Sequence, residues 1–537
     1  MMNNTKRFDV VVIGAGVTGL YAIQKLRETK LSFRCIERYE DLGGTWYKNR
    51  YPGCTLDSET LSYQFSFSEE LLEEWDWQSR FSKQPQLLEY INHAAAKFDW
   101  RQDIDFGVHI KSANWNEQNA NWTLTDESGD LEYIAKYIIF ATGPLSEPLY
   151  PDYPGRDDFQ GLQTHSIHWD ERFDDLDGKR VAVIGTGATA IQIITEVAKR
   201  DCNLSVFQFR PDWATPLGNG LLTDEEKAEF KGEAATRSFD RLKKTFGSFV
   251  HEFIEEGSLL DLTREEQQAH LNDRYYSPGF AMWLGSYQST IMDPEANKIV
   301  TNFVADKIRS RVNDPEIAEK LIPKDHGFGL KRVPMESGYY ESYNRPNVAL
   351  VDLLETPIER FTAKGIKTTE KDYEFDVIVY ATGFNAFVGP YENIDIIGKS
   401  GVSLKEYWAD GVKSYLGMTP SGFPNTFMPL GPLNGGTLCN FPRCIERNVD
   451  WVINCIQSLE ERGVREIEPK PSNEAEWVDV VAEIADQLLL STVGSWFNGQ
   501  NTAHRPKQFL AYFGGNPNYY NILDAEAANG YPGFALS

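Results

Sequence analysis

Two glycine-rich turns, each between an apolar run and an amphipathic run, constrain the fold most. The first is Gly14-Ala15-Gly16-Val17-Thr18-Gly19, which follows the apolar run 7–14 and opens a helical pattern. The second is Gly185-Thr186-Gly187-Ala188-Thr189-Ala190, within residues 179–208, which show the same order of strand, turn, helix and strand. A strand, a G-x-G-x-x-G/A turn and a helix form the dinucleotide-binding unit of parallel α/β sheets. The chain is therefore predicted to be an α/β protein with two Rossmann-like dinucleotide-binding domains.

The positions of the first turn have distinct physical roles. Gly14 permits the tight turn, Gly16 lets a pyrophosphate approach the backbone, and Gly19 lets helix and strand pack closely. The helix N-terminus attracts phosphate. Glu37 ends the next apolar run, where a carboxylate accepts hydrogen bonds from a ribose. The alternative to a nucleotide site is an ordinary glycine-rich turn, with Glu37 at this position by chance.

The strand after the second turn ends in Gln208-Phe209-Arg210 and carries no acid. An arginine at this place suits the 2′-phosphate of NADPH, although an exposed surface arginine is the simpler alternative. Two dinucleotide sites in one chain indicate FAD together with a nicotinamide cofactor. That pair performs hydride transfer and often O2 chemistry afterwards.

The rest of the chain adds strands, a helical insertion and a C-terminal region. The apolar runs Tyr137–Gly143 and Asp376–Gly383 each end in Ala-Thr-Gly and predict buried strands. Residues 217–322 show no strand pattern and are rich in charged residues, which predicts inserted helices. Residues 474–490 predict another amphipathic helix. The Gly-, Asn- and aromatic-rich segment from Trp496 onwards predicts ordered loop.

Charge and cysteine spacing exclude several classes of protein. The net charge of −26 argues against nucleic-acid binding, which needs a basic surface. No run of 18 apolar residues and no signal core is present, so we expect no membrane partner and a cytoplasmic location. The six cysteines form no CxxC pair, which argues against a disulfide reductase and a zinc ribbon. We expect most of them to be reduced core thiols, and no metal.

A fingerprint between the two turns resembles that of a known family. Phe159-x-Gly161-x-x-x-His165-x-x-x-Trp169-Asp170 is similar to the fingerprint of the type I Baeyer–Villiger monooxygenases, a branch of the class B flavin monooxygenases. Related flavin-containing and N-hydroxylating monooxygenases usually have Tyr or Phe where Trp169 stands. The resemblance extends over nearly the whole chain.

The resemblance implies a reaction and a catalytic pair. NADPH would reduce FAD, O2 would form a flavin peroxide, and the peroxide would attack a ketone to give an ester or lactone. Arg332 matches the family's catalytic arginine, and Asp57 matches the acid that pairs with it. A guanidinium stays protonated and stabilises the negative charge of the reaction. An ordinary salt bridge is the alternative for this pair.

The resemblance also implies a division into domains. Residues 1–143 and 376–537 would bind FAD. Residues 152–216 and 330–375 would bind NADPH, and residues 217–329 would form the helical insertion.

Cofactor contacts follow from the same resemblance. Residues 43–57 resemble a flavin-covering segment, Lys331 corresponds to a lysine that reaches the 2′-phosphate, and Trp496 resembles a tryptophan that covers the nicotinamide cofactor. His165 and Trp169 are interpreted as holding the interdomain link. The expected cofactor-binding positions are Gly14, Gly16, Thr18, Gly19, Glu37, Thr45, Trp46, Asp57, Tyr63, Thr142, Gly143, Gly185, Thr186, Gly187, Ala188, Thr189, Ala190, Gln192, Arg210, Lys331 and Trp496.

Three positions depart from the family pattern. Lys48 stands where a second Trp is common, Phe209 where many members have Arg, and Asn385 where Asp is frequent. They bear on cofactor affinity and selectivity. Two alternatives to a Baeyer–Villiger enzyme remain at this point: a monooxygenase that hydroxylates N or S, and a non-catalytic flavin and NADPH redox sensor. The redox sensor would have no use for an Arg332–Asp57 pair.

Overall fold

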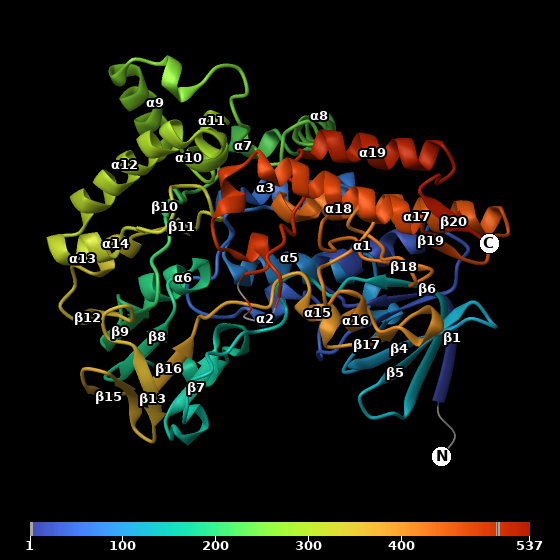
Figure 1. Ribbon diagram of the computed structural model, residues 1–537, viewed down its shortest axis with the longest axis horizontal. Helices are drawn as coiled ribbons and strands as arrows, with labels where there is room; N and C mark the ends of the chain where they lie inside the picture. Colours follow the sequence, from blue (N-terminus) through green and yellow to red (C-terminus); the bar gives the residue numbers. More distant parts are fainter. Residues whose placement is uncertain (1–3, 501, 503–504) are drawn as a thin grey trace.

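The computed structural model describes residues 4–500, 502 and 505–537. Two large sheets lie at opposite ends of the lower half of the molecule in Figure 1, each carrying one glycine-rich turn. Helices of the insertion rise above the second sheet, and C-terminal helices cover the first. The predicted α/β class with two nucleotide-binding units is confirmed.

The first sheet carries the Gly14 turn. Its described strands are β1 (Asn4–Ile13), β2 (Phe33–Ile36), β3 (Ile104–Asp105), β4 (Ile110–Asn116), β5 (Asn121–Asp126), β6 (Leu131–Phe140), β17 (Asp395–Ile397) and β18 (Thr426–Phe427). β1 pairs in parallel with β2 and β6, and β4, β5 and β6 form an antiparallel meander. Residues Val10, Val11 and Val12 of β1 are fully buried, as expected for the centre of a covered sheet.

The second sheet carries the Gly185 turn and is entirely parallel, in the order β12-β9-β8-β16-β7. Its strands are β7 (Leu162–His165), β8 (Arg180–Ile184), β9 (Asn203–Gln208), β12 (Val348–Asp352) and β16 (Val377–Tyr380). A small antiparallel sheet of β13 (Ile358–Thr362), β14 (Gly365–Thr368) and β15 (Asp372–Glu374) precedes β16.

The position of β16 corrects one predicted boundary. Residues 376–537 were expected to belong to the FAD side, yet β16 pairs with β8 and β7 of the second sheet. The boundary therefore falls after Tyr380. The apolar pattern of a buried parallel strand marks it as buried but does not encode which strands it pairs with.

The insertion is helical, as predicted. It contains α7 (Asp224–Ala228), α8 (Gly232–Leu242), α9 (Arg264–Tyr276), α10 (Ala281–Leu284), α11 (Ser289–Met292), α12 (Pro294–Arg311) and α13 (Pro315–Lys320). The chain enters it after β10 (Thr215–Pro216) and returns at β11 (Met335–Glu336), and these two short strands pair in parallel. No helix among the described residues is long and apolar enough to cross a membrane.

The remaining described helices lie around the sheets. They are α1 (Val17–Leu26), α2 (Thr45–Lys48), α3 (Thr60–Tyr63), α4 (Glu69–Glu74), α5 (Gln84–Lys97), α6 (Ala188–Val197), α14 (Tyr339–Ser342), α15 (Gly389–Glu392), α16 (Leu404–Tyr407), α17 (Phe441–Glu461), α18 (Pro471–Asp486) and α19 (Asn516–Ala528).

The C-terminal region differs from its prediction. The helix expected over 474–490 is present as α18, followed by a short 3-10 turn. The segment after Trp496 was expected to be loop, but it contains α19 and β20 (Phe534–Leu536), which pairs with β19 (Ile467–Pro469). The buried face of α19 includes Asn516 and Glu526, so its apolar pattern is weak and the helix was missed.

The two glycine-rich turns show why glycine is needed at their first position. Gly14 and Gly185 have φ of +107° and +111°. A Cβ at Gly14 would lie 2.5 Å from the carbonyl oxygen of Ala141, which follows β6. A Cβ at Gly19 would lie 1.8 Å from the carbonyl oxygen of Gly14, whereas the second unit accommodates the fully buried methyl of Ala190. Helix and strand therefore pack more closely in the first unit.

Candidate active site

Both glycine-rich turns open onto one cavity of about 600 Å³. Gly14, Gly16 and Thr18 line it from the first unit, and Gly187, Ala188 and Thr189 line it from the second. Two dinucleotides bound at these turns would therefore meet in one space. Of the other expected site residues, those that also line the cavity are Glu37, Thr45, Trp46, Asp57, Tyr63, Thr142, Gly143, Gln192, Arg332 and Trp496.

The first turn fits a pyrophosphate. A Cβ at Gly16 would lie 3.5 Å from Cα of Gly44, so the backbone on both sides of this space is bare of side chains. Glu37 is fixed at the cavity wall because Oε2 accepts a hydrogen bond from the Ala15 amide at 2.7 Å and Oε1 accepts one from the Tyr39 amide at 3.0 Å. Burial raises the pKa of Glu37, although these backbone donors act to lower it.

The segment expected to cover the flavin is attached to the second unit. Gln192 of α6 accepts a hydrogen bond from the Tyr51 hydroxyl at 2.9 Å and donates to the carbonyl oxygen of Thr55 at 3.1 Å. On the other side, Trp46 of the segment connects it to α3, because Trp46 Nε1 donates a hydrogen bond to the Tyr63 hydroxyl at 3.2 Å. Gln192 therefore joins α6 of the second unit to residues 43–57 of the first by two hydrogen bonds.

Arg332 and Asp57 are 275 residues apart in sequence and meet at the cavity. Nη2 of Arg332 donates to Oδ2 of Asp57 at 2.7 Å, and the Asp57 side chain is only 10% exposed. Burial raises the pKa of Asp57, and Arg332 lowers it. Nη1 of Arg332 and Oδ1 of Asp57 are buried without a hydrogen-bond partner. The pair therefore retains one donor and one acceptor for a bound molecule.

A second group of charges lies outside the cavity lining. Arg210 Nη1 and Lys331 Nζ approach the same oxygen, Oδ2 of Asp325, at 3.3 and 3.7 Å. Burial alone would raise the pKa of Asp325, but its hydrogen bond with His326 and the charge of Lys331 outweigh it, and the net pKa is lowered. The Arg210 side chain is 53% exposed and therefore accessible to a phosphate, whereas the Lys331 side chain is only 18% exposed.

The remaining four of the expected cofactor-binding positions do not line the cavity but shape the glycine-rich turns. Gly19, Gly185 and Ala190 lie where helix and strand meet. The Thr186 hydroxyl donates to the carbonyl oxygen of Arg210 at 2.8 Å and so links the turn to the end of β9.

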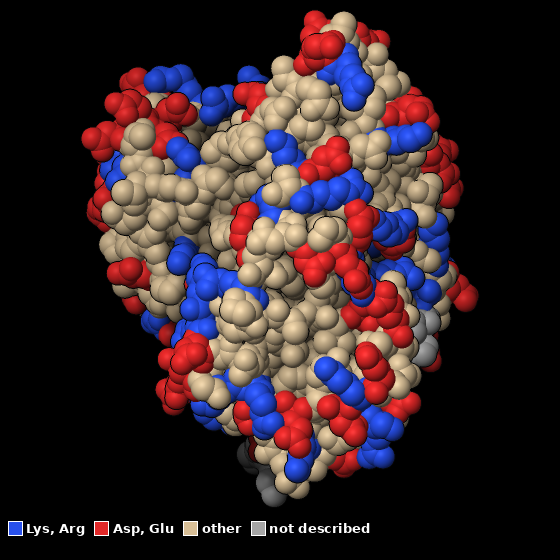
Figure 2. Space-filling view, turned by 90° about the vertical axis from the view of Figure 1, so that its left-hand side faces the viewer, with Lys and Arg blue, Asp and Glu red and all other residues tan. Residues whose placement is uncertain are grey.

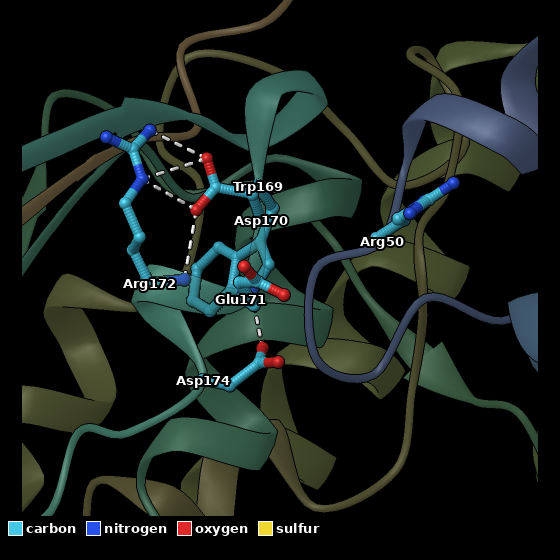
Figure 3. Close-up of a pocket in the computed structure, with 6 residues that line it drawn as sticks. All are labelled: Arg50, Trp169, Asp170, Glu171, Arg172 and Asp174. Atoms are coloured by element: carbon cyan, nitrogen blue, oxygen red, sulfur yellow. Dashed lines mark hydrogen bonds and ion pairs between the residues drawn. The ribbon is translucent and has the colours of Figure 1, made fainter. Parts of the chain in front are cut away.

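Three residues of the fingerprint, Phe159, His165 and Trp169, are buried in the connection between the two sheets. The Trp169 ring points to Asp174 and donates to it through Nε1 at 3.0 Å, beside a small polar surface pocket (Figure 3). His165 is fully buried, Nε2 lies 3.1 Å from the carbonyl oxygen of Gly383, and Nδ1 accepts the Ile167 amide. Burial lowers the pKa of His165 to about 4. A neutral imidazole that joins β7 to the segment after β16 fits a linking role.

Comparison with known proteins decides the family. Residues 8–231 match the model of the pyridine nucleotide-disulphide oxidoreductase family. The 2-oxo-Delta(3)-4,5,5-trimethylcyclopentenylacetyl-CoA monooxygenase of Pseudomonas putida is 40% identical over 100% of both chains. The acetone monooxygenase (methyl acetate-forming) of Gordonia sp. (strain TY-5) is 38% identical over 99% of this chain and 100% of its own. The crystal structure of OTEMO with FAD and NADP matches with a TM-score of 0.94 and 40% identity over 99% of each chain.

The Baeyer-Villiger monooxygenase of Pseudooceanicola batsensis is 37% identical over 98% of this chain and 95% of its own. The chain belongs to the Baeyer–Villiger monooxygenases. The predicted family, the reaction class and the two cofactors, FAD and NADP, are thereby confirmed. A further relative, 37% identical over 100% of this chain and 98% of its own, is the phenazine N-monooxygenase PhzNO1 of Lysobacter antibioticus.

This Baeyer–Villiger monooxygenase has an apolar cavity wall that sequence reasoning missed. The loops 144–146 and 431–440 both contribute to it. Aromatic residues of the insertion and apolar residues around the start of α17 complete the wall. No pattern in the sequence distinguishes them from ordinary core residues. They are Phe249, Phe280, Trp283, Leu430, Leu438, Phe441 and Ile445.

Proposed function

We propose that this Baeyer–Villiger monooxygenase converts a hydrophobic ketone to an ester or lactone, with Arg332 and Asp57 as its catalytic pair. The support is the 2.7 Å contact between Arg332 and Asp57 on a cavity with an aromatic wall. Bound FAD, reduced by NADPH, supplies the activated oxygen. The guanidinium of Arg332 holds the negative charge that develops at the carbonyl oxygen, and Asp57 orients the guanidinium.

Each nucleotide unit has its own proposed role. The Gly14 unit holds FAD and the Gly185 unit holds NADPH, whose 2′-phosphate binds Arg210 and Lys331. Trp496, which stacks on Phe387 with ring centroids 5.4 Å apart, covers the nicotinamide side and excludes water. Because NADPH is regenerated inside cells, we place the enzyme in the cytoplasm.

The test is a panel of ketones of increasing size, with NADPH consumption and product mass measured together. Each buried methylene contributes about 0.8 kcal/mol, so cyclohexanone should exceed acetone by roughly tenfold or more in kcat/KM. Aromatic N-heterocycles and thioethers complete the panel. An N-oxide or sulfoxide as the sole product would replace this proposal with heteroatom hydroxylation, the activity that the phenazine N-monooxygenase relative favours.

A further inference from the structure

A pair of cysteines lies at the border of the ketone cavity. Cys439 lines the cavity, and Cys444 lies in the first turns of α17. The two are joined as a disulfide with their Cα atoms 6.5 Å apart, so this pair is the exception to the expectation that most of the six cysteines are reduced. The other cysteines, Cys35, Cys54, Cys202 and Cys455, are free and buried.

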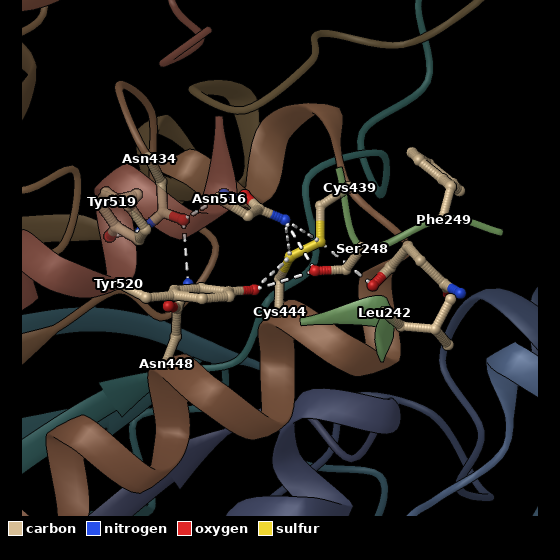
Figure 4. The surroundings of a disulfide bond; sticks show 12 residues. Leu242, Ser248, Phe249, Asn434, Cys439, Cys444, Asn448, Asn516, Tyr519 and Tyr520 are labelled. Carbon is tan, nitrogen blue, oxygen red and sulfur yellow. Dashed lines mark hydrogen bonds between the residues drawn. A yellow bond between two sulfur atoms is a disulfide. The ribbon is translucent and has the colours of Figure 1, made fainter. Parts of the chain in front are cut away.

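Two polar groups of α19 contact the sulfurs, and Ser248 of the insertion contacts both of these groups (Figure 4). Nδ2 of Asn516, at the start of α19, lies 3.2 Å from each Sγ and 3.0 Å from Oγ of Ser248. The Tyr520 hydroxyl lies 3.4 Å from Sγ of Cys444. In the reduced state these donors and the N-terminus of α17 stabilise a thiolate, which is the reactive form of cysteine.

We propose that Cys439 and Cys444 form a reversible redox site that hydrogen peroxide oxidises and that adjusts the ketone cavity. The Cys439 thiolate attacks one peroxide oxygen, the O–O bond breaks, and the departing hydroxide takes up the proton that the thiol had released, so that a sulfenic acid and water form. The Cys444 thiol then displaces the second water and closes the disulfide. Two thiols and one peroxide thus give one disulfide and two waters, and a small dithiol reductant reverses the change.

Because Cys439 lines the cavity, it lies where hydrogen peroxide would form, and a change at Cys439 would alter the cavity wall. Hydrogen peroxide is the by-product of a monooxygenase whose reduced oxygen is not transferred, so it arises in the cavity that Cys439 lines. Leu438 precedes Cys439, Phe441 lies between the two cysteines, and both line the same cavity. Asn440 between them donates to the carbonyl oxygen and hydroxyl of Ser62 on α3. The disulfide fixes this turn against α17, and reduction releases it.

The experiment compares two states of the purified holoenzyme. One sample is treated with dithiothreitol, and the other with equimolar hydrogen peroxide followed by catalase. Under denaturing conditions the first should show six reactive thiols and the second four, with the missing pair mapped to Cys439 and Cys444. The ketone KM should differ roughly fourfold between the states, which is the effect of one wall methylene moving in or out of contact.

Two variants provide the controls. Cys444→Ser should keep one KM under both treatments. Cys455→Ser, which changes a buried cysteine on the same helix, should keep the wild-type response. The proposal is overturned if Cys439 and Cys444 of the wild type both still react with iodoacetamide after peroxide, or if the KM shift persists in Cys444→Ser. The thiol count on the wild type decides the question even where a variant fails to fold.

Discussion

Nε2 of His251 lies 3.1 Å from Oε1 of Glu59, with both side chains less than one-fifth exposed. The insertion therefore contacts the segment that carries Asp57. Gly279 of the insertion packs on the same oxygen, because a Cβ there would lie 2.7 Å from Oε1 of Glu59. The neighbouring Phe280 ring covers the Arg332 guanidinium at 5.5 Å. The insertion thus contacts Glu59, two residues after Asp57, and also the guanidinium of Arg332.

Glu59→Gln should loosen Asp57, which lies two residues before it. Because the contact between the Glu59 carboxylate and His251 is lost, ester formed per NADPH consumed should fall by roughly tenfold, which corresponds to about 1.4 kcal/mol in the barrier. FAD reduction by NADPH should keep its rate. The matched control is His93→Gln, which removes the more exposed His93–Glu74 pair. Unchanged coupling in Glu59→Gln would show that the pair serves stability alone.

Arg332→Ala should separate reduction from oxygen transfer. A preorganised group that stabilises developing charge is worth about 3–4 kcal/mol, or roughly a hundredfold to thousandfold in rate. Ester formation should therefore be lost, while the surviving NADPH oxidation yields hydrogen peroxide. Arg309→Ala, at an exposed arginine of the insertion, is the control. An ester yield near that of the wild type would remove Arg332 from the catalytic pair.

Arg210→Ala and Lys331→Ala should each weaken NADPH binding by roughly ten- to a hundredfold, because a charged hydrogen bond to the 2′-phosphate is lost. KM for NADH should barely change, since NADH lacks this phosphate. Lys324→Ala, a neighbouring exposed lysine paired with Glu319, is the control. If the NADPH-to-NADH ratio stays constant in both variants, the phosphate binds elsewhere.

His165 should make stability depend on pH between its unfolded and folded pKa values. The unfolded imidazole takes up a proton below about pH 6.5, but the native one does so only near pH 4, so stability is lost as the pH falls through this window. At pH 5 the loss relative to pH 7.5 should be about 2 kcal/mol. Urea unfolding of wild type and His165→Asn at both pH values measures it, and an equal loss in both would contradict the assignment.

Local signals explain what was predictable. The glycine turns and the continuous apolar runs identified β1, α1, β8 and α6, because tight turns and buried parallel strands impose residue types at fixed places. Even here β1 begins at Asn4 rather than Arg7, since its pairing with Leu131 of β6 extends it. The Arg332–Asp57 contact was predicted only because those positions match a family pattern.

Contacts between distant segments explain what was not predictable. The apolar run of β16 has the composition of a buried strand in either sheet, so its partners follow from the assembled fold. Glu59 and His251 are 192 residues apart, and neither stands in a pattern that marks it. Phe249 and Trp283 have the sequence surroundings of core residues in a helical region, although they line the cavity.

The parallel pairing of β10 with β11 has a consequence for the evolution of such enzymes. Thr215 pairs with Met335 and Pro216 with Glu336, so the insertion leaves and rejoins the molecule at one seam. Figure 2, which faces the insertion and the second sheet, shows a surface hollowed between two lobes. Residues 217–330 form a cassette that supplies one wall of the ketone cavity but neither glycine turn. Recombination at this seam would exchange the insertion's wall between relatives while both glycine turns and Asp57 stay in place, and the exchanged segment would bring its own residues at positions 331 and 332.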